Sequence, residues 1–528
     1  MITCKIDRKS CVGLPSFIDN KYTWPDGSQL SILNNPYISS TIFHDKQRWI
    51  CIIRVLSHPA NKEPKIIPLT PSKLTSIYKD FSSIESESIL VEMVTGEHGN
   101  VVRIISGNEG SVPIYFCTNN EKIYFSWDFK KIASTRQSVT IDIEYVVKST
   151  FEPIYTNRTA FQGIYMLTAG TSCTFSDSSC DYKFPLESTE LRTINSIDPD
   201  DAIYEFTNLI KNKMRSQLLN PHKMAIELSG GLDSSTVAIA IAHTFPSSTI
   251  NTYGIVISDP SLIESQCIRR EEVIRHIGAR DHIIKIMDHL PSLSSSAEDK
   301  YYLNSEADGE AFDSIWAQAA KDGHHLVING CGGDELFPQF LDEDFTTDRM
   351  RSMNDHEWHS YNKILMNRLS PKAQDILSSS LLPCAPRTSA ETCLMLAMIR
   401  RAPLLLGLNL IPLYPFRDRK IIEFCRNLPT SMRVNKSLLS NFISKTMTKD
   451  TFKNYPKENF MHADKLALLR QKETLIALHT KFRIIEIGLI DQKTLMLDLE
   501  RLNTNTPSHI LDYLSNLLSI ERFLKAYL

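Results

Sequence analysis

The pattern of hydrophobic and polar positions changes in character near residue 195. Before that point, short runs rich in β-branched residues are separated by turn-forming stretches, a pattern typical of β-strands. The clearest of these runs are residues 49–56, 89–94, 101–105, 112–116 and 122–128. Residues 1–195 are therefore expected to form a domain made mostly of strands.

After residue 195, apolar runs of strand length alternate with longer segments of helical spacing. A first helix is expected to begin at Asp198-Pro199, a capping residue followed by proline in the first turn. The expected strands are residues 224–228, 250–257, 282–286 and 325–329, and the expected helices are 234–245, 261–277 and 310–321. This alternation predicts an α/β domain with a doubly wound parallel sheet, which binds ligands at the carboxyl ends of its strands. Residues 462–528 are expected to be helical.

Length and composition agree with a two-domain globular protein. The 528 residues suffice for domains at 1–195 and 196–528, joined by a linker near residues 187–198. A net charge of −3 and the lack of a basic run argue against nucleic-acid binding. The amino terminus lacks the apolar core of a signal peptide, and no apolar stretch approaches the length of a membrane span. The eleven cysteines include no C-x-x-C pair, so a cytoplasmic location is expected.

The chain is organised around Leu228-Ser229-Gly230-Gly231-Leu232-Asp233-Ser234-Ser235, which lies between an expected strand and an expected helix. Glycines let the backbone approach a phosphate closely, and the free N–H groups and dipole of a helix N-terminus favour its negative charge. No lysine precedes the Ser234-Ser235 pair, so the loop differs from a Walker A loop. Asp233 is instead an oxygen ligand suited to Mg²⁺ on a triphosphate.

A second glycine-rich string, Asn329-Gly330-Cys331-Gly332-Gly333-Asp334-Glu335-Leu336-Phe337, follows the expected strand 325–329. The carboxyl ends of parallel strands meet at one edge of a sheet, so Asp233 and Asp334 are expected to face a single site. Mg²⁺ takes few ligands from protein and leaves the rest to phosphate and water. Two carboxylates therefore suffice for a magnesium site here.

Both strings resemble known signatures. Residues 229–235 look like the pyrophosphate-binding loop of the ATP pyrophosphatases, and residues 329–337 resemble the second signature of the asparagine synthetase branch of that family. The resemblance implies ATP and Mg²⁺ as cofactors, with Asp233 and Asp334 as the metal ligands. It also implies a nucleotide site formed by Leu228, Ser229, Gly230, Gly231, Asp233, Ser234, Ser235, Ile255 and Gly330. Ile255 would lie near the adenine, although a plain buried strand residue is an equally good interpretation of that position.

The first domain is similar to the amino-terminal glutaminase domain of asparagine synthetases, an Ntn-type α+β fold. The similarity lies in the hairpin of residues 112–128 and in residues 159–170. Glutaminase chemistry requires a cysteine as the first residue after removal of Met, whereas position 2 is Ile2 and the nearest cysteine is Cys4. The domain is therefore expected to be an inactive scaffold, with exposure of Cys4 by processing as the less favoured alternative. The nucleophile is then an amine on the substrate.

Three later segments resemble the family and also depart from it. Tyr455-Pro456-Lys457 is similar to the Arg-Pro-Lys string of the β-lactam-forming synthetases, which implies that Lys457 stabilises charge in the acyl-transfer transition state. Residues 413–418 lack the arginine of the family's substrate-binding segment and have Arg417 in place of a leucine. Residues 436–439 keep the lysine of a Lys-x-x-Leu-Arg string without its arginine. Substrate binding by residues 413–418 is therefore in question.

Cys331 is a candidate catalytic residue because it occupies the position at which the asparagine and β-lactam enzymes have Glu or Tyr. A thiol with a lowered pKa could deprotonate the attacking amine. The favoured alternative for Cys331 is a small packing residue. In that case the amine loses its proton to another side chain or to solvent.

The apolar carboxyl-terminal helix, residues 511–524, resembles the end of the synthetases that close lasso peptides. That resemblance implies an AMP-forming macrolactam synthetase, which adenylates an Asp or Glu side chain of a ribosomal precursor peptide and joins it to the peptide's amino terminus. The expected partners are the precursor peptide and a leader peptidase of the same pathway, with no nucleic acid and no membrane. The alternatives are a glutamine- or ammonia-dependent asparagine synthetase, a β-lactam-type synthetase acting on a small amino acid derivative, and a non-catalytic scaffold.

Overall fold

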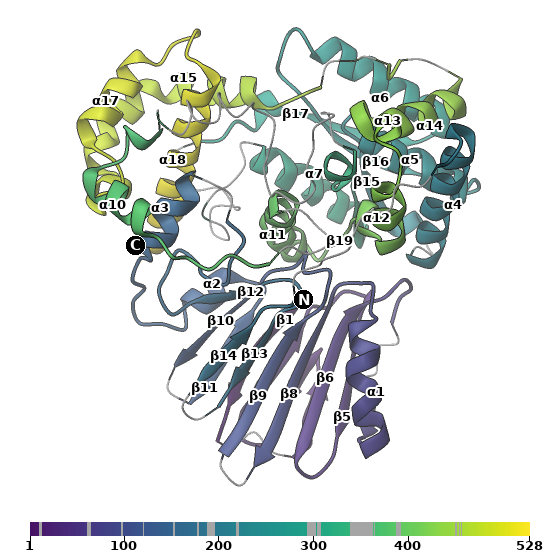
Figure 1. The fold of residues 1–528 in the computed structure, drawn as a ribbon, viewed down its shortest axis with the longest axis vertical. Helices are drawn as coiled ribbons and strands as arrows, with labels where there is room; N and C mark the ends of the chain where they lie inside the picture. The colour runs from purple at the N-terminus through teal and green to yellow at the C-terminus, as the bar shows by residue number, and fades with distance from the viewer. Residues whose placement is uncertain are drawn as a thin grey trace.

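The computed structural model describes most of the chain. The described residues are 1–9, 13–60, 65–96, 99–119, 121–151, 154–176, 179–186, 196–217, 221–292, 303, 308–337, 363, 365–386, 392–448, 451–453, 455 and 457–528. Figure 1 shows a strand-rich part, formed by the amino-terminal residues, beneath a part in which helices surround a separate sheet. Most of the expected linker at 187–198 lies outside the described residues, so the domain boundary at residue 195 stays a prediction.

The described amino-terminal residues form two seven-stranded sheets. The strands are β1 (Ile2–Asp7), β2 (Ser16–Ile18), β3 (Lys21–Thr23), β4 (Gln29–Ile32), β5 (Ile38–His44), β6 (Arg48–Val55), β7 (Lys65–Pro68), β8 (Ser88–Gly96), β9 (Gly99–Ser106), β10 (Ile114–Asn119), β11 (Lys122–Ser126), β12 (Tyr165–Leu167), β13 (Ser172–Phe175) and β14 (Cys180–Lys183). Their orders are β12-β10-β11-β1-β4-β3-β2 and β14-β13-β9-β8-β6-β5-β7. The predicted strand-rich character is confirmed, whereas the resemblance to a glutaminase domain stays a prediction.

The two sheets enclose a shared hydrophobic core. Alternate residues of β1 point inward, so Ile2, Cys4 and Ile6 are buried, as the two-residue period of a strand requires. They belong to one cluster with side chains of the second sheet such as Val91 and Ile104. β1 pairs with β11 on one side and with β4 on the other. Cys4 is therefore a core residue of a strand that is hydrogen-bonded on both sides.

A five-stranded parallel sheet carries the second part of the chain, which confirms the predicted α/β architecture. Its strands are β15 (Met224–Glu227), β16 (Asn251–Val256), β17 (Arg280–Lys285), β18 (Leu326–Ile328) and β19 (Ile411–Leu413), in the order β17-β16-β15-β18-β19. Helices α4 (Pro199–Gln217), α5 (Leu232–Thr244) and α6 (Ile263–Ile277) pack on one face, and α7 (Gly309–Lys321) and α11 (Thr392–Gly407) on the other. The sequence pattern does not predict β19, because three residues are too few to show a strand period.

The carboxyl-terminal residues are helical, as predicted, and they return to the strand-rich part. The helices are α10 (Pro371–Ser379), α15 (Met461–Leu478), α16 (Arg483–Glu486), α17 (Gln492–Arg501) and α18 (Ser508–Tyr527). They share a hydrophobic cluster with α2 (Phe129–Ala133) and α3 (Ile143–Phe151). In α18, the ring centroid of Phe523 lies 5.7 Å from those of both Phe129 and Phe161. The last helix therefore ties the end of the chain to its amino-terminal part.

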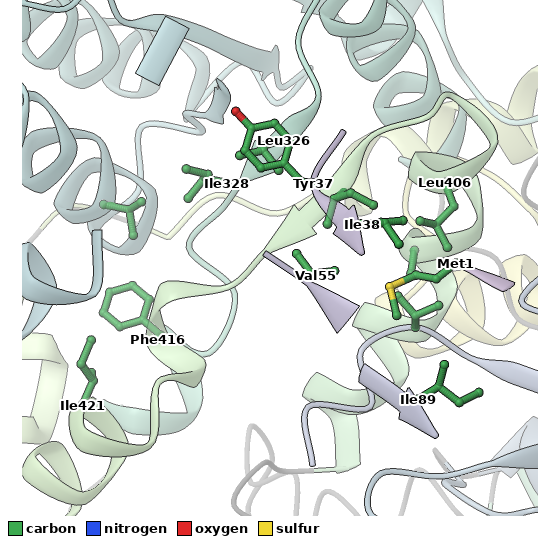
Figure 2. Close-up of a cluster of buried hydrophobic side chains, with 14 of the residues drawn as sticks. Met1, Tyr37, Ile38, Val55, Ile89, Leu326, Ile328, Leu406, Phe416 and Ile421 are labelled. Carbon is green, nitrogen blue, oxygen red and sulfur yellow. The ribbon is translucent and has the colours of Figure 1, made fainter. Parts of the chain in front are cut away.

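A second contact joins the strand-rich part to the parallel sheet. Figure 2 shows part of the hydrophobic cluster at this contact, with Met1 and Ile89 from one part and Leu406 from the other. Next to it, Asn35 Nδ2 donates a hydrogen bond to the Asn409 carbonyl oxygen at 2.7 Å. The remaining longer helices are α1 (Pro71–Ser82), α12 (Arg419–Arg426) and α14 (Ser437–Met447). Among the described residues, none of the helices combines the length and the apolar character that crossing a bilayer requires.

Candidate active site

The first glycine-rich loop connects β15 to α5, as the sequence predicts. Gly231 is the N-cap of α5, so the first N–H groups of the helix point out of its end. Serine hydroxyls hold the loop: the Ser229 N–H donates to Ser234 Oγ at 3.1 Å and the Gly231 N–H donates to Ser229 Oγ at 3.2 Å. The Leu232 N–H donates to the hydroxyl of Tyr455 at 3.1 Å. Tyr455 therefore contacts the helix N-terminus that is predicted from the sequence to bind phosphate.

Buried polar side chains of α6 support the loop from behind. Gln266 and Arg269 are each 1% exposed. Gln266 Nε2 donates to the carbonyl oxygens of Ser229 at 2.9 Å and Ile255 at 3.1 Å, and Arg269 Nε donates to that of Gly230 at 2.9 Å. The sequence pattern shows α6 only as a polar helix, because inward-facing polar residues give no hydrophobic period. The structure shows that these polar residues fix the loop and the end of β16.

The second glycine-rich string packs closely against the first. It follows β18 and leads into the short helix α8 (Gly333–Leu336). A Cβ atom on Gly330 would lie 2.7 Å from the Ser234 nitrogen, and a Cβ atom on Gly333 would lie 2.3 Å from Asp233 Cγ. A side chain at either position would push the two strings apart, which is a reason for glycine where backbones approach closely. The glycines therefore bring Asp334 next to Asp233.

Lysines and aspartates meet where the two strings touch. Lys436 Nζ bonds to Asp233 Oδ2 and lies 2.7 Å from Asp334 Oδ1. Lys457 Nζ lies 2.8 Å from the same Asp334 oxygen. The Lys436 side chain is 8% exposed and that of Lys457 is 56% exposed. The structure thus brings Asp233, Asp334 and Lys457 together, and it adds Lys436, to which the sequence motifs give no role.

The backbone at Lys436 is unusual. Asn435 and Lys436 have φ values of 53° and 55°, in the left-handed region that residues other than glycine seldom adopt. Each such residue costs on the order of 1 kcal/mol or more and persists where the surroundings hold it. Here the ion pairs of Lys436 with two carboxylates hold it at the start of α14.

Burial and charge act in opposite directions on this cluster. Burial raises the pKa of Asp233, and the nearby Lys436 opposes that rise. Burial would also raise the pKa of Asp334, but Lys436 and Lys457 together outweigh it and lower the pKa to about 2. Burial would lower the pKa of Lys436, but the two carboxylates outweigh it and raise that pKa. Asp334 is therefore ionised and Lys436 protonated at neutral pH.

These groups line one cavity of about 800 Å³, within the size range of small-molecule sites. Of the residues predicted from sequence, the cavity is lined by Leu228, Ser229, Gly231, Asp233, Ser234, Ile255, Gly330, Cys331, Asp334 and Lys457. Gly230 and Ser235 do not line it. Gly230 has a φ of 91° and packs against α6, and Ser235 is 0% exposed within α5. Further lining residues to which the sequence reasoning gives no role include Glu227, Arg401, Tyr455 and Glu458.

The two aspartates provide oxygen donors of the kind that magnesium takes. Asp233 Oδ1 is buried and has no hydrogen-bond partner among the described residues, so it can accept a ligand. In the part of the chain that the structure describes, no group of three or more His, Cys, Asp or Glu side chains is suited to a metal ion. The assignment of Asp233 and Asp334 as magnesium ligands, with phosphate and water as the others, therefore stays a prediction.

Cys331 lies in a polar corner of the cavity. Its N–H donates to Asn329 Oδ1 at 3.0 Å, and Arg401 Nη1 donates to its Sγ at 3.8 Å. In the same cavity, Glu227 at the end of β15 accepts a hydrogen bond from Trp316 Nε1 at 2.8 Å. The residue that sequence reasoning singles out as a candidate base is thus accompanied by an arginine and a buried carboxylate, both of which that reasoning misses.

The chain is similar to proteins of one known class. Residues 205–385 match the family model described as asparagine synthase. Both glycine-rich strings lie inside this segment, whereas Lys436 and Lys457 lie beyond its end. No curated protein matches the chain.

Solved structures with some similarity include enzymes of three kinds. The U34-tRNA thiolase NcsA of Methanococcus maripaludis is 11% identical with a TM-score of 0.27, and the match covers 58% of this chain and 80% of that one. The NH3-dependent NAD synthetase of Campylobacter jejuni is 16% identical with a TM-score of 0.19, covering 50% and 99%. The NMN synthetase of Francisella tularensis is 13% identical with a TM-score of 0.19, covering 50% and 100%. TM-scores this low carry no argument, so the class rests on the family model. Residues 205–385 are therefore similar to the asparagine synthase domain.

Proposed function

We propose that the protein is an ATP-dependent amide ligase that closes a macrolactam ring in a ribosomally made peptide. The carboxylate of an Asp or Glu side chain attacks the α-phosphorus of ATP, and pyrophosphate leaves. The amino terminus of the same peptide then attacks the acyl-adenylate, and AMP leaves. The observation that carries this proposal is the meeting of Asp233, Asp334, Lys436 and Lys457 beside the glycine-rich loop in one cavity.

The cavity residues suit such a reaction. A carboxylate does not react with an amine at a useful rate because oxide is a poor leaving group, and adenylation replaces it with a good one. The N–H groups at the start of α5 that have no partner in the helix would hold the departing pyrophosphate. Lys436 is fixed between the two carboxylates, where its ammonium holds Asp233 and Asp334 together. Lys457, more exposed, is suited to stabilise charge that develops at the acyl carbon.

Magnesium would be held by Asp233 and Asp334 and would supply Lewis-acid and charge-neutralising chemistry at the phosphates. Two lysines and two aspartates carry no net charge together, so the protein side chains of this cluster offset little of the charge of a triphosphate. A need for added positive charge is consistent with Asp233 Oδ1, which is buried and has no hydrogen-bond partner among the described residues.

The burial of Cys4 in the strand-rich part supports the proposal that the attacking amine belongs to the peptide substrate. Cys4 is 4% exposed and lies in β1, which is paired on both sides, so its thiol is not available for glutamine hydrolysis. A substrate that holds both reacting groups on one chain gains much of its rate from proximity. The partners of this proposal are the precursor peptide and a leader peptidase that frees its amino terminus.

The test is ATP:pyrophosphate exchange with three candidate substrates: a leader-free peptide, aspartate, and a small β-amino acid derivative. The proposal expects exchange with the peptide, formation of AMP, and loss of one water from the peptide mass. Exchange with aspartate and formation of asparagine would favour an asparagine synthetase instead. Exchange with the β-amino acid would favour a β-lactam-type enzyme. Conversion of ATP to ADP would refute all three synthetase hypotheses.

Two variants distinguish the adenylation step from the ring-closing step. Asp233→Ala should abolish exchange because it removes a carboxylate from the phosphate end of the cavity. Lys457→Ala should lower ring closure far more than it lowers exchange, because its proposed role is in acyl transfer. Ring closure at the full rate by Lys457→Ala would show that this role is wrong.

A further inference from the structure

The proposed reaction needs a base, because the attacking amine loses a proton as the amide forms. Among the described residues, four acidic side chains line the cavity: Glu227, Asp233, Asp334 and Glu458. Asp233 and Asp334 hold Lys436 between them. Glu458 is paired with the buried guanidinium of Arg269. Glu227 is in neither of these pairings, so its carboxylate is the acid of the four that remains available.

Glu227 is also well placed. It is the last residue of β15, two positions before Ser229, at the end of the strand where ligands of a parallel sheet bind. The side chain is 9% exposed and lines the cavity. Its Oε1 accepts a hydrogen bond from Trp316 Nε1 at 2.8 Å, which fixes the carboxylate on the side of α7. A buried and oriented carboxylate at the reacting end of a cavity is suited to proton transfer.

We infer that Glu227 is the general base that deprotonates the attacking amine, an inference that rests on the proposed function. A neutral amine attacks the carbonyl carbon of the acyl-adenylate, and one N–H proton passes to the Glu227 carboxylate as the C–N bond forms. The tetrahedral intermediate then breaks its C–O bond to the phosphate, and AMP leaves with the electron pair. Glu227 later releases the proton to solvent.

The surroundings of Glu227 favour this role over that of a permanent ion-pair partner. Burial raises the pKa of Glu227, while Arg401 and the hydrogen bond from Trp316 oppose that rise. A raised pKa makes the carboxylate a stronger base, nearer to the working pH than an exposed carboxylate. The charged or titratable groups that interact with Glu227 from other elements are Arg401 of α11 and Tyr414 after β19, and Cys331 after β18 lies next to both of them. Burial raises the pKa of Tyr414 well above its usual value, so it stays neutral.

The test compares the two half-reactions in Glu227→Gln. This variant keeps an oxygen that accepts from Trp316 and removes the basic carboxylate. ATP:pyrophosphate exchange should stay within about twofold of wild type, while amide formation should fall by about 100-fold or more, the usual contribution of a general base. The limb of the pH–rate profile that rises with deprotonation of Glu227 should disappear. Hydroxylamine, which is largely unprotonated at neutral pH, should trap the adenylate equally fast in variant and wild type.

Two more variants separate catalysis from structure. Glu227→Asp keeps the carboxylate but shortens the side chain by one methylene group, which moves the carboxylate away from the attacking amine. Amide formation should therefore fall partly, and the pH limb should remain. Asp308→Asn is a matched control: Asp308 is 5% exposed and 3.9 Å from Arg401, but it does not line the cavity. It should leave both half-reactions within about twofold of wild type, since no general-base contribution is removed.

Several outcomes would overturn the inference. Ring closure by Glu227→Gln at the wild-type rate would show that Glu227 takes no part in the proton transfer. Equal losses of exchange, hydroxylamine trapping and ring closure would assign it a structural role. A wild-type protein that shows no exchange with any carboxylate would instead refute the proposed function itself, before any variant is measured.

Discussion

Replacing Gly330 or Gly333 by alanine tests whether the two glycine-rich strings must touch for the site to form. Neither glycine has a positive φ, so alanine adds no backbone strain and the effect is purely steric. At Gly330 the new Cβ would meet backbone atoms, Ser234 N at 2.7 Å and the Asp233 carbonyl carbon at 2.8 Å, which cannot rotate away. At Gly333 it would meet Asp233 Cγ and Oδ1, both at 2.3 Å. The Asp233 carboxylate can turn aside only by leaving Lys436.

Overpacking of this kind costs about 1–3 kcal/mol. Gly330→Ala should lie at the upper end of that range, because the start of α5 has to move, and Gly333→Ala nearer the lower end. For a domain of roughly 200 residues, each kcal/mol lowers the melting temperature by about 2–4 °C. Both variants should also lose most ATP:pyrophosphate exchange, because each displaces Asp233.

The matched control is Gly231→Ala, in the same cavity. Its Cβ would lie 3.4 Å from Ser229 Oγ and 3.7 Å from Tyr455 Oη, which are ordinary contacts, so the melting temperature should fall less than in Gly330→Ala, by the small amount that alanine costs at the N-cap of α5. Its exchange activity should still fall, because the added methyl group stands where phosphate approaches the loop. Melting and exchange at wild-type values in Gly330→Ala would refute the close contact between the two strings.

Three other predictions concern stability. Lys436→Met should cost about 3 kcal/mol in chemical denaturation, because it leaves the largely buried Asp233 carboxylate without its counter-ion, whereas Lys457→Met at an exposed pair should cost about 1 kcal/mol or less. Equal losses would contradict the buried position of Lys436. Burial raises the pKa of Asp464 to about 7, so its contribution to stability is present below the unfolded pKa of about 4 and is lost as the pH rises towards 7. Asp464→Asn should therefore flatten the melting temperature across that pH range, and an unchanged slope would disprove the assignment. Phe523→Ala should cost about 3–5 kcal/mol and speed proteolysis within α18, since Phe523 is 2% exposed between two aromatic rings; an unaltered cleavage rate would count against that packing.

Hydrophobic patterns were sufficient to predict those helices and strands that bury one apolar face or a continuous apolar run. β15 is buried at every position, and the three apolar residues Met224, Ala225 and Ile226 indicate it directly. The return of α18 to the strand-rich part could not be predicted in this way. Phe129, Phe161 and Phe523 are all apolar residues in apolar runs, and a pattern within one segment does not say which distant segment will cover it.

The candidate site was predictable where one short string carries several of its parts. Asp233 and Asp334 stand in such strings, and parallel strands bring the two together. Lys436 was given no role although residues 436–439 keep the lysine of a family string, because it reaches Asp233 across 203 positions of the sequence and a single lysine is normally solvated. Gln266 and Arg269 were missed for a different reason. Their polar character indicates a surface, whereas their hydrogen bonds to loop carbonyl oxygens explain their burial.

The departure of residues 413–418 from the family pattern has a structural explanation that bears on the substrate. Arg417 is 4% exposed, and its Nη1 donates to the carbonyl oxygen of Glu109 in the strand-rich part at 3.0 Å. The neighbouring Asp418 pairs with Lys213 at 2.8 Å. None of residues 413–418, all of which the structure describes, lines the cavity. Arg417 therefore joins the two parts of the molecule. Under the proposed function, substrate recognition then has to come from the residues that line the cavity. A cavity that contains Arg401 and Glu227 favours a polar substrate group over an apolar one.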